Sequence, residues 1–356
     1  MSVPASLKVF DRSVKLAQRS RAARSPNASD YFYLRKEIAD RLTERLLDIT
    51  KPLPRILDVG CGAGAFVAQA LNKYQPGPSQ RPHCEKLLCT DASNEVVRRA
   101  QRELEAAVSQ AVAEADAQAA TEGASNTRPL TTSFETQFEV LDEGSATFAD
   151  RLLQVTSDAP FDAVLSCMNL HWVNDLGSAF NQLGRLLKPD GVFLGAMLGG
   201  ETLRELRVSM QLAEEEVWSG VSPHVSPMVQ VQDVAPLLSN HAGLTMCTVD
   251  TDVIEVTFQD FGALMRHLQG MGENNCALGR RTHFGRRAFK RAEEIYKERF
   301  GSSDEGYITA SFMVVYMIGW KPHELQPKPA RRGSQQFSLR DLSELSERVP
   351  GGFPHQ

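Results

Sequence analysis

The sequence predicts an α/β protein built on a doubly wound, mostly parallel seven-stranded sheet with an antiparallel last strand. Three observations predict this fold. The apolar run Arg55–Val59 leads into a turn with three alternating glycines, after which a helical apolar pattern begins. A second run, Leu87–Asp91, ends in an acid as the first one does. The run Pro160–Cys167 is almost continuously apolar, which is typical of a strand buried on both faces.

The glycine turn predicts a nucleotide-type ligand. Gly60, Gly62 and Gly64 allow a sharp turn and bring backbone amides close to a ligand. Gly60, Gly62 and Ala65 also match the dinucleotide fingerprint. Asp58 argues against that match, because a carboxylate at the strand end repels a pyrophosphate. S-adenosylmethionine carries an ammonium and a sulfonium, so Asp58 favours the class I S-adenosylmethionine-dependent methyltransferase fold.

Two further strand ends carry acids. We expect Asp91 to accept hydrogen bonds from the ribose hydroxyls, as acids at this position do in doubly wound sheets. A solvent-facing helix cap is the alternative role for Asp91. Asp142 follows the predicted strand Phe138–Leu141, and we expect it to accept the adenine amino group. A solvated loop acid is the alternative there.

Composition limits the classes of function. With 356 residues, 42% hydrophobic and 23% charged, the chain can bury a large core. A net charge of −5 gives no global attraction to nucleic acid. The stretch His83–Glu85 partly resembles an iron-binding triad, but it begins a strand away from the ligand edge, so we expect no metal site. The longest apolar run, Ile308–Trp320, is too short to span a membrane.

Residues 1–50 are expected to form an N-terminal helical segment that covers the site. The first 25 residues are basic, with Asp11 as the single acid. Such a start is typical of a mitochondrial transit peptide or of a basic helix in the folded enzyme, and Phe10–Arg12 favours the helix. An amphipathic helix is expected over Asp30–Ile49.

Residues 51–200 are expected to form the cofactor-binding core. After Asp91 a helix begins at Ser93 and continues into an Ala- and Gln-rich insertion at about 105–133, which we interpret as a surface feature without chemistry. A helix over Phe180–Leu187, the turn Lys188–Gly191 and a strand over Val192–Met197 complete this core.

Five residues are candidates for the substrate pocket. His171, Trp172 and Asp175 follow the fourth strand at its carboxyl end, where ligands bind in such sheets. Glu201 begins a long helix, and Glu273 lies in the turn-rich stretch Gly270–Asn275. We expect the acids to select a cationic substrate. Local roles are the alternatives: a packing tryptophan, a turn histidine, a helix cap and an exposed loop acid.

Residues 201–321 are expected to form a helical cover and the remaining strands, and residues 322–356 a partly ordered tail rich in Pro, Arg and Ser. The expected elements here are helices over Thr202–Trp218, Val231–His241, Phe261–Leu268 and Arg286–Phe300, an extended segment over Thr245–Val256, and the antiparallel last strand over Ile308–Ile318.

The chain resembles a family of mitochondrial complex I assembly factors that are methyltransferase-like protein-arginine hydroxylases. The resemblance extends over nearly the whole chain. It rests on Phe10–Arg12, Asp58–Gly62, Leu170–Asp175, Leu187–Gly191, Gly195–Met197, Gly199–Leu203, Ser222–Pro227, Leu268–Glu273, Met317–Lys321 and Arg332–Ser334. The chain departs from the family in the Ala- and Gln-rich insertion and in having no obvious presequence ahead of Phe10.

The resemblance implies S-adenosylmethionine binding and hydroxylation of an arginine in an iron–sulfur subunit of complex I during early assembly. It also implies a peripheral location at the matrix face of the mitochondrial inner membrane. It identifies neither the oxidant nor the catalytic residues. The residues alone favour a methyltransferase, although a guanidinium that stays protonated is a poor nucleophile towards a sulfonium. A carboxyl or small-molecule methyltransferase and a non-catalytic assembly chaperone are the alternatives.

Overall fold

The computed structural model describes residues 8–62, 84–122, 135–157, 159–281, 283–301, 306–328 and 332–334, and residues 108 and 110–122 by their backbone alone. The chain divides into one unit from Met1 to Pro322 and a second from His323 to Gln356. All elements below belong to the first unit. Within the second, residues 323–328 and 332–334 are the described part.

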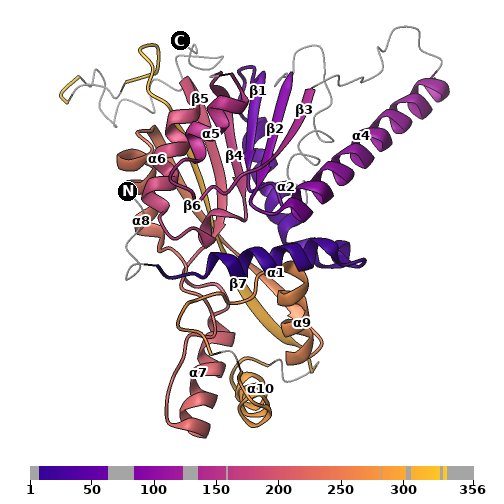
Figure 1. Ribbon diagram of the computed structural model, residues 1–356, viewed down its shortest axis with the longest axis vertical. Helices are drawn as coiled ribbons and strands as arrows, with labels where there is room; N and C mark the ends of the chain where they lie inside the picture. The colour runs from indigo at the N-terminus through magenta and orange to yellow at the C-terminus, as the bar shows by residue number, and fades with distance from the viewer. Residues whose placement is uncertain are drawn as a thin grey trace, which may run out of the picture. The chain divides into compact units, whose positions relative to one another are not determined.

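One seven-stranded sheet runs through the first unit, with the strand order β3-β2-β1-β4-β5-β7-β6 (Figure 1). Its strands are β1 (Arg55–Val59), β2 (Lys86–Asp91), β3 (Glu135–Val140), β4 (Phe161–Cys167), β5 (Leu187–Leu198), β6 (Thr245–Phe258) and β7 (Ile308–Trp320). β7 pairs antiparallel with both β5 and β6, and the remaining pairs are parallel. The predicted fold class is confirmed, including the single antiparallel strand at the end of the chain.

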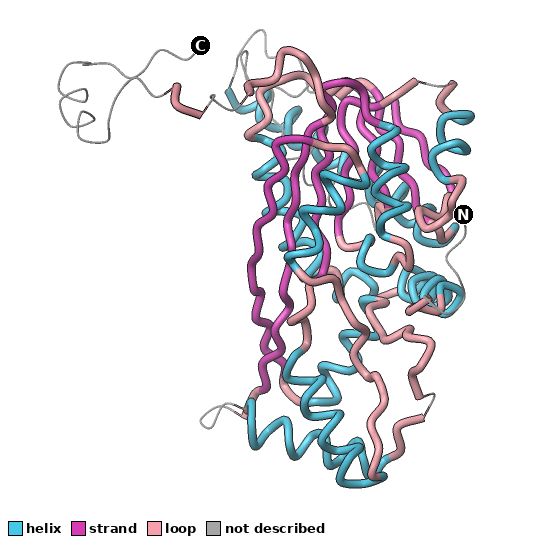
Figure 2. The backbone as a smooth tube through the Cα atoms, turned by 90° about the vertical axis from the view of Figure 1, so that its left-hand side faces the viewer, coloured by secondary structure: helices cyan, strands magenta, loops and turns pink. Residues whose placement is uncertain are grey.

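Helices cover both faces of this sheet (Figure 2). They are α2 (Tyr33–Leu47) and α4 (Asn94–Glu122) on one face, and α5 (Phe148–Val155), α6 (Leu176–Leu186), α8 (Val231–Pro236) and η4 (Leu237–His241) on the other. Successive strand residues alternate between the two cores: Ile56 packs with the α2 side and Leu57 with the α6 side. Because both faces are buried, the central strands read as continuous apolar runs.

The N-terminal segment folds as part of this unit. Helix α1 (Arg12–Arg24) is capped by Asp11, whose side chain accepts a hydrogen bond from the Val14 amide. The short 3₁₀ segment η2 (Ala28–Tyr31) connects α1 to α2, so the amphipathic helix expected from Asp30 begins at Tyr33. In Figure 1, α1 (indigo) runs across the lower end of the parallel strands.

The chain after β5 extends the sheet and adds helices below it. β6 and β7 form a long antiparallel pair that reaches down to these helices (Figure 2). The added helices are α7 (Arg204–Trp218), α9 (Phe261–Met271) and α10 (Arg286–Phe300). The short 3₁₀ helix η3 (Leu170–Trp172) lies earlier in the chain, between β4 and α6. Helix α9 continues to Met271 and therefore includes Gly270, which was expected to lie in a turn.

One predicted turn lies inside a strand. Lys188–Gly191 belongs to β5, which begins at Leu187 because Leu187 already pairs with Phe161 of β4. The pairing register shifts before Ala163, and Asp190 has a left-handed backbone conformation with φ of 62°. The residues predicted to form a turn therefore form an irregularity within β5 that changes the direction of the strand, and β5 begins before them.

Candidate functional site

The carboxyl edge of the sheet brings the two strand-end acids together. Asp58 of β1 lies beside Cys89 of β2 in the parallel register, and Asp91 ends β2. Between them the chain turns at Gly60 and Gly62, with φ of 68° and 58°. These left-handed values explain why glycine is needed at both positions. Gly64 lies outside the described residues.

Asp58 is a buried carboxylate to which no described residue donates a hydrogen bond. Its side chain is 1% exposed, and neither carboxyl oxygen has a partner among the described residues. Burial raises the pKa of Asp58 from its ordinary value of 3.8 to about 7; Arg35 partly offsets this, and Asp91 adds to it. A buried acid in this state is costly, so it points to a missing donor or cation.

Asp91 differs from Asp58 because its oxygens are already engaged. Oδ1 accepts a hydrogen bond from the Ser93 amide at 3.0 Å. Oδ2 accepts one from Arg19 of α1 at 2.8 Å and a longer one from the Gly62 amide at 3.4 Å. Arg19 also donates to the Asn169 side chain. A guanidinium of the chain itself therefore occupies the carboxylate predicted to bind ribose.

Asp142, the predicted adenine ligand, is also paired with α1. Arg12 donates to Asp142 and, at 2.8 Å, to Glu143. Asp142 is exposed, whereas Glu143 is buried. Asp142 additionally caps its own turn by accepting from the Gly144 amide. The structure thus places Asp142 near Asp91, across a small hollow of about 160 Å³ that Lys15 and Arg19 also line.

Three of the predicted pocket residues meet in one buried cluster. Oε2 of Glu273 accepts hydrogen bonds from Trp172 Nε1 at 2.7 Å and from His171 Nε2 at 3.2 Å. The Leu198 amide donates to His171 Nδ1, so Nε2 carries the imidazole proton and donates to Glu273. The two motifs are about 100 residues apart in sequence, and only the fold joins them.

The charges in this cluster are held in fixed states. Burial opposes ionisation of Glu273, but the His171 hydrogen bond and the charges of Lys15 and Arg35 outweigh it and lower the pKa of Glu273 to about 2. Burial lowers the pKa of His171, although Glu273 counteracts the effect. Near neutral pH the cluster therefore holds an ionised carboxylate and a neutral imidazole.

Lys15 and Arg35 join the cluster from the N-terminal helices. The Lys15 ammonium lies 3.4 Å from the centre of the Trp172 ring and donates to the carbonyls of Gly272 and Asn274 at 3.0 and 2.7 Å. Burial lowers the pKa of Lys15 to about 8, against the opposing effect of Glu273. Arg35 of α2 lies 3.8 Å from Glu273 Oε1.

Arg35 also contacts the end of β4 and the glycine turn. Its two Nη atoms donate to the carbonyls of Cys167 and Met168 at 2.9 and 3.0 Å. A Cβ added at Gly62 would lie 2.5 Å from Arg35 Nη1. Arg35 therefore connects the glycine turn, the end of β4 and Glu273.

The other two predicted pocket acids lie outside the cluster. Asp175 caps α6 by accepting a hydrogen bond from the Ser178 amide at 2.9 Å, which is a local structural role. Glu201 is exposed and makes no hydrogen bond or ion pair with another described residue. It does not cap α7, whose cap position is Leu203. Neither acid is placed to act with Glu273.

Sequence reasoning missed the basic residues that complete the site. Arg12, Lys15 and Arg19 are spaced by three and four residues, which places them on one face of α1. Three cations on one helical face were the available signal. Their partners lie between 72 and 259 residues away in sequence, so local pattern could not identify them.

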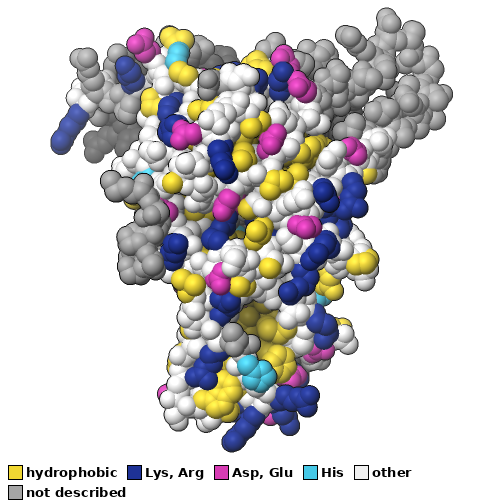
Figure 3. All heavy atoms as spheres, in the orientation of Figure 1, with side chains coloured by type: hydrophobic (Ala, Val, Ile, Leu, Met, Phe, Trp, Pro, Cys, Tyr) yellow, Lys and Arg dark blue, Asp and Glu magenta, His cyan; other side chains and the backbone are white. Residues whose placement is uncertain are grey.

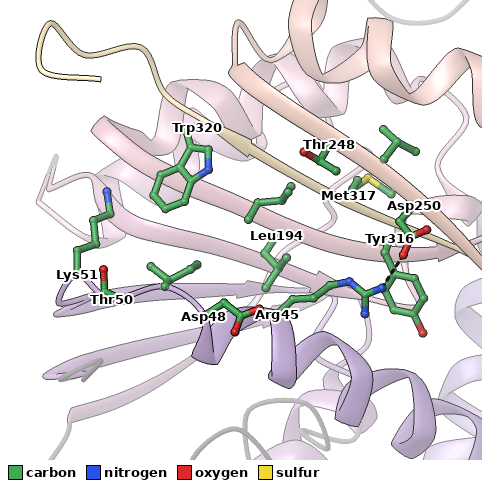
Figure 4. Close-up of a pocket in the computed structure, with 13 residues that line it drawn as sticks. Arg45, Asp48, Thr50, Lys51, Leu194, Thr248, Asp250, Tyr316, Met317 and Trp320 are labelled. Carbon is green, nitrogen blue, oxygen red and sulfur yellow. Dashed lines mark hydrogen bonds and ion pairs between the residues drawn. The ribbon is translucent and has the colours of Figure 1, made fainter. Parts of the chain in front are cut away.

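One large groove lies on the face of the antiparallel strands. A groove of about 660 Å³ opens between the end of α2 and the antiparallel strands, with Leu194 in its floor (Figure 4). Arg45 stacks on Tyr316 and pairs with Asp250, while Lys51 lies over Trp320. The groove extends along β7 from Trp320, which pairs with Val192 of β5, to Tyr316, which pairs with Ala196. None of the predicted site residues lines it.

The described residues contain neither a metal-binding cluster nor a membrane-spanning helix. Within that part of the chain, no group of three or more His, Cys, Asp or Glu side chains is placed to hold a metal ion. None of the described helices is both long and apolar enough to cross a membrane. His83 lies outside the described residues, and Glu85 donates its amide to Pro54 at the start of β2.

Comparison with known proteins identifies the family. A methyltransferase-domain model matches residues 31–249. The zebrafish mitochondrial arginine-hydroxylase NDUFAF5 is 39% identical over 341 residues, covering 96% of this chain and 91% of the relative. The human arginine-hydroxylase NDUFAF5 is 38% identical, covering 99% and 88%. A malonyl-[acyl-carrier protein] O-methyltransferase from Methylovorus is 27% identical, covering 87% and 90%. The chain therefore belongs to the NDUFAF5 arginine-hydroxylase family and carries a methyltransferase domain.

Proposed function

We propose that the protein is an S-adenosylmethionine-binding arginine hydroxylase. In this proposal it modifies an iron–sulfur subunit of complex I during early assembly, as a peripheral protein at the matrix face of the mitochondrial inner membrane. The names of the NDUFAF5 relatives, which are arginine-hydroxylase and mitochondrial, support the activity and the compartment. The methyltransferase domain supports the cofactor.

The observation that carries the cofactor assignment is the unpartnered carboxylate of Asp58. S-adenosylmethionine would bring an ammonium group to this edge, and no described residue supplies Asp58 with the donors that a buried carboxylate requires. The glycine turn supports the assignment because it brings backbone amides to the same edge, where Gly60 and Gly62 hold left-handed conformations that a side chain would strain. Asp58, Gly60, Gly62 and Asp91 would therefore hold the cofactor, with Gly64 and Asp142 as further candidates.

In the methyltransferase alternative, bound S-adenosylmethionine would supply a methyl group activated by its sulfonium, whereas hydroxylation does not use that methyl group. The residues of the chain perform the remaining tasks in this proposal. Asp58 and Asp91 fix the two polar ends of the cofactor, and the buried surroundings of both acids exclude water. His171 stays neutral and holds the Glu273 carboxylate in place through its Nε2 proton. Trp172 holds the same oxygen from the other side.

Glu273 is the proposed partner of the substrate guanidinium. Its Oε2 accepts hydrogen bonds from His171 and Trp172, whereas among the described residues Oε1 has a single ion pair, with Arg35 at 3.8 Å. A substrate arginine can take the place of Arg35 there without breaking the two shorter bonds. Charge-assisted hydrogen bonds of this type contribute about 1.5–3 kcal/mol. The carbon that gains oxygen and the oxidant are not assigned to any residue.

The methyltransferase alternative rests on the malonyl-carrier O-methyltransferase relative, whose match spans most of both chains. The third possibility is an assembly chaperone in which the cofactor serves stability alone.

One experiment separates the three functions. The protein is incubated with S-adenosylmethionine and the iron–sulfur subunit, and the mass of each arginine-containing peptide is measured. Gain of one oxygen supports the hydroxylase, gain of one methyl group supports the methyltransferase, and an unchanged mass supports the chaperone.

A further inference from the structure

Helix α1 connects the cofactor edge to the substrate cluster. Arg12, Lys15 and Arg19 lie on one face of the helix and contact Glu143, the Gly272 carbonyl and Asp91 respectively. The helix is further tied down by the Asp11 amide, which donates to the Cys276 carbonyl at 2.8 Å. Other basic side chains remain exposed at the level of α1 (Figure 3). Movement of α1 would therefore change both sites at once.

Arg19 occupies the carboxylate assigned to the cofactor. Asp91 is 1% exposed and Arg19 is 9% exposed, so water does not screen their 2.8 Å ion pair. With the amides of Ser93 and Gly62, Arg19 gives Asp91 three donors. A ribose diol would donate to the same two oxygens. Arg19 and the ribose cannot both hold Oδ2 in this arrangement.

The two hollows that described residues form around this ion pair are smaller than a nucleotide site. The hollow lined by Asp91, Arg12 and Lys15 measures about 160 Å³, and the one lined by Gly62 and Arg35 about 30 Å³. Ligand sites for molecules of this size usually measure about 300–1,000 Å³. Binding of the cofactor therefore requires displacement of α1 side chains.

We propose that three basic side chains of α1 form a latch and that this latch competes with S-adenosylmethionine for Asp91. The latch consists of Arg12, Lys15 and Arg19. When the ribose takes Asp91, Arg19 is released and α1 lifts from the edge. Because Lys15 is one helical turn away, the same movement frees the carbonyls of Gly272 and Asn274 beside Glu273. The inference rests on the proposed function, since it takes Asp91 as the ribose ligand.

The latch fixes an order of binding. In the closed form, Lys15 covers Trp172 and pins the segment that carries Glu273, so the substrate arginine cannot reach its carboxylate. Cofactor binding removes this cover, and the substrate follows. The coupling is reciprocal: an interaction that holds α1 on the strand ends weakens cofactor binding by the same factor by which the cofactor weakens that interaction.

The first test removes the competing cation. Arg19→Met keeps much of the side-chain volume and loses the charge, so we expect it to bind S-adenosylmethionine roughly ten-fold more tightly, as calorimetry would measure. Arg21→Met is the matched control, because Arg21 is exposed on the same helix and pairs with no other described residue. It should bind like the parent protein. Unchanged or weaker binding by Arg19→Met would show that Arg19 does not compete with the cofactor.

The second test locks the latch. The hydroxyl oxygens of Ser20 on α1 and Ser93 after β2 are 2.7 Å apart, which suits a disulfide in the double variant Ser20→Cys/Ser93→Cys. The oxidised protein should lose cofactor binding, and reduction should restore it. Ser93→Cys alone controls for loss of the α4 cap, since Ser93 also accepts from the Val96 amide.

The outcomes separate the latch from the proposed function. Equal binding by the oxidised and reduced double variant overturns the latch and leaves the cofactor assignment standing. If the parent protein, Arg19→Met and the reduced double variant all fail to bind, the cofactor assignment is wrong and the latch falls with it. Binding by Arg19→Met in the absence of detectable binding by the parent supports both.

Discussion

Replacement of Asp58 by asparagine should stabilise the cofactor-free protein at alkaline pH while weakening cofactor binding. The carboxyl group is buried, unpartnered and raised in pKa to about 7 from 3.8. Its folded-state pKa lies above its unfolded value, so the folded protein binds the proton more strongly. The stability that this proton contributes is fully present below pH 3.8 and is lost as pH rises through about 7. Asparagine does not titrate and avoids the loss.

The magnitude follows from the two pKa values. One pKa unit corresponds to about 1.4 kcal/mol, so the penalty on the parent at high pH is at most roughly 4 kcal/mol. Between about pH 5 and about pH 8 the advantage of Asp58→Asn should grow by roughly 2–3 kcal/mol. The amide leaves a polar group buried at every pH, so only the change between the two conditions is diagnostic.

Urea unfolding of both proteins at these two pH values, without cofactor, measures the effect. Glu201→Gln is the matched control, because it removes one acid from an exposed position without a partner among the described residues. Its stability relative to the parent should not change with pH. If the advantage of Asp58→Asn is equally independent of pH, the carboxyl group is not strained by burial and the argument for a missing cationic partner fails.

Three more variants test other parts of the site. Gly62→Val should abolish S-adenosylmethionine binding and cost at least about 1–2 kcal/mol of stability, because valine resists φ of 58° and displaces Arg35; normal binding by a folded variant would contradict the turn assignment. Glu273→Gln should weaken binding of an arginine-containing substrate peptide about ten-fold or more and leave cofactor affinity unchanged, while Glu201→Gln should affect neither; equal peptide binding by both would place the guanidinium elsewhere. The pKa of Lys15 is about 8 in the folded protein and ordinarily 10.5, so the parent gains stability as pH rises between these values. In Lys15→Met the free energy of unfolding should depend less on pH over this range; an unchanged pH profile in urea titrations would show that burial does not destabilise the Lys15 ammonium.

The sheet could be predicted because its signals are local. Strands buried on both faces produce the continuous apolar runs at Ile56 and Val164, and the turn after β1 needs glycine at two left-handed positions. The strand-end acids Asp58 and Asp91 followed from the same pattern. Because β1 and β2 pair in parallel, their carboxyl ends lie at the same edge of the sheet, and so do the two acids.

The basic half of the site could not be predicted because its contacts are long-range. A helix face with Arg12, Lys15 and Arg19 looks solvent-exposed in sequence, and only the docking of α1 across the strand ends buries Lys15 and Arg19. The sequence pattern likewise made Asp175 and Glu201 candidates for the substrate pocket on the same grounds as Glu273. Tertiary packing separates them: Glu273 is buried between two ring donors, whereas the other two lie outside the cluster.

A crystal structure with bound S-adenosylmethionine tests the central claim most directly. The cofactor's ammonium should lie within hydrogen-bond distance of Asp58, and its ribose hydroxyls should donate to Asp91 in place of Arg19. Helix α1 should then be displaced from the strand ends. A cofactor bound elsewhere, or one bound at this edge with Arg19 still on Asp91 and Asp58 still without a donor, would contradict the assignment.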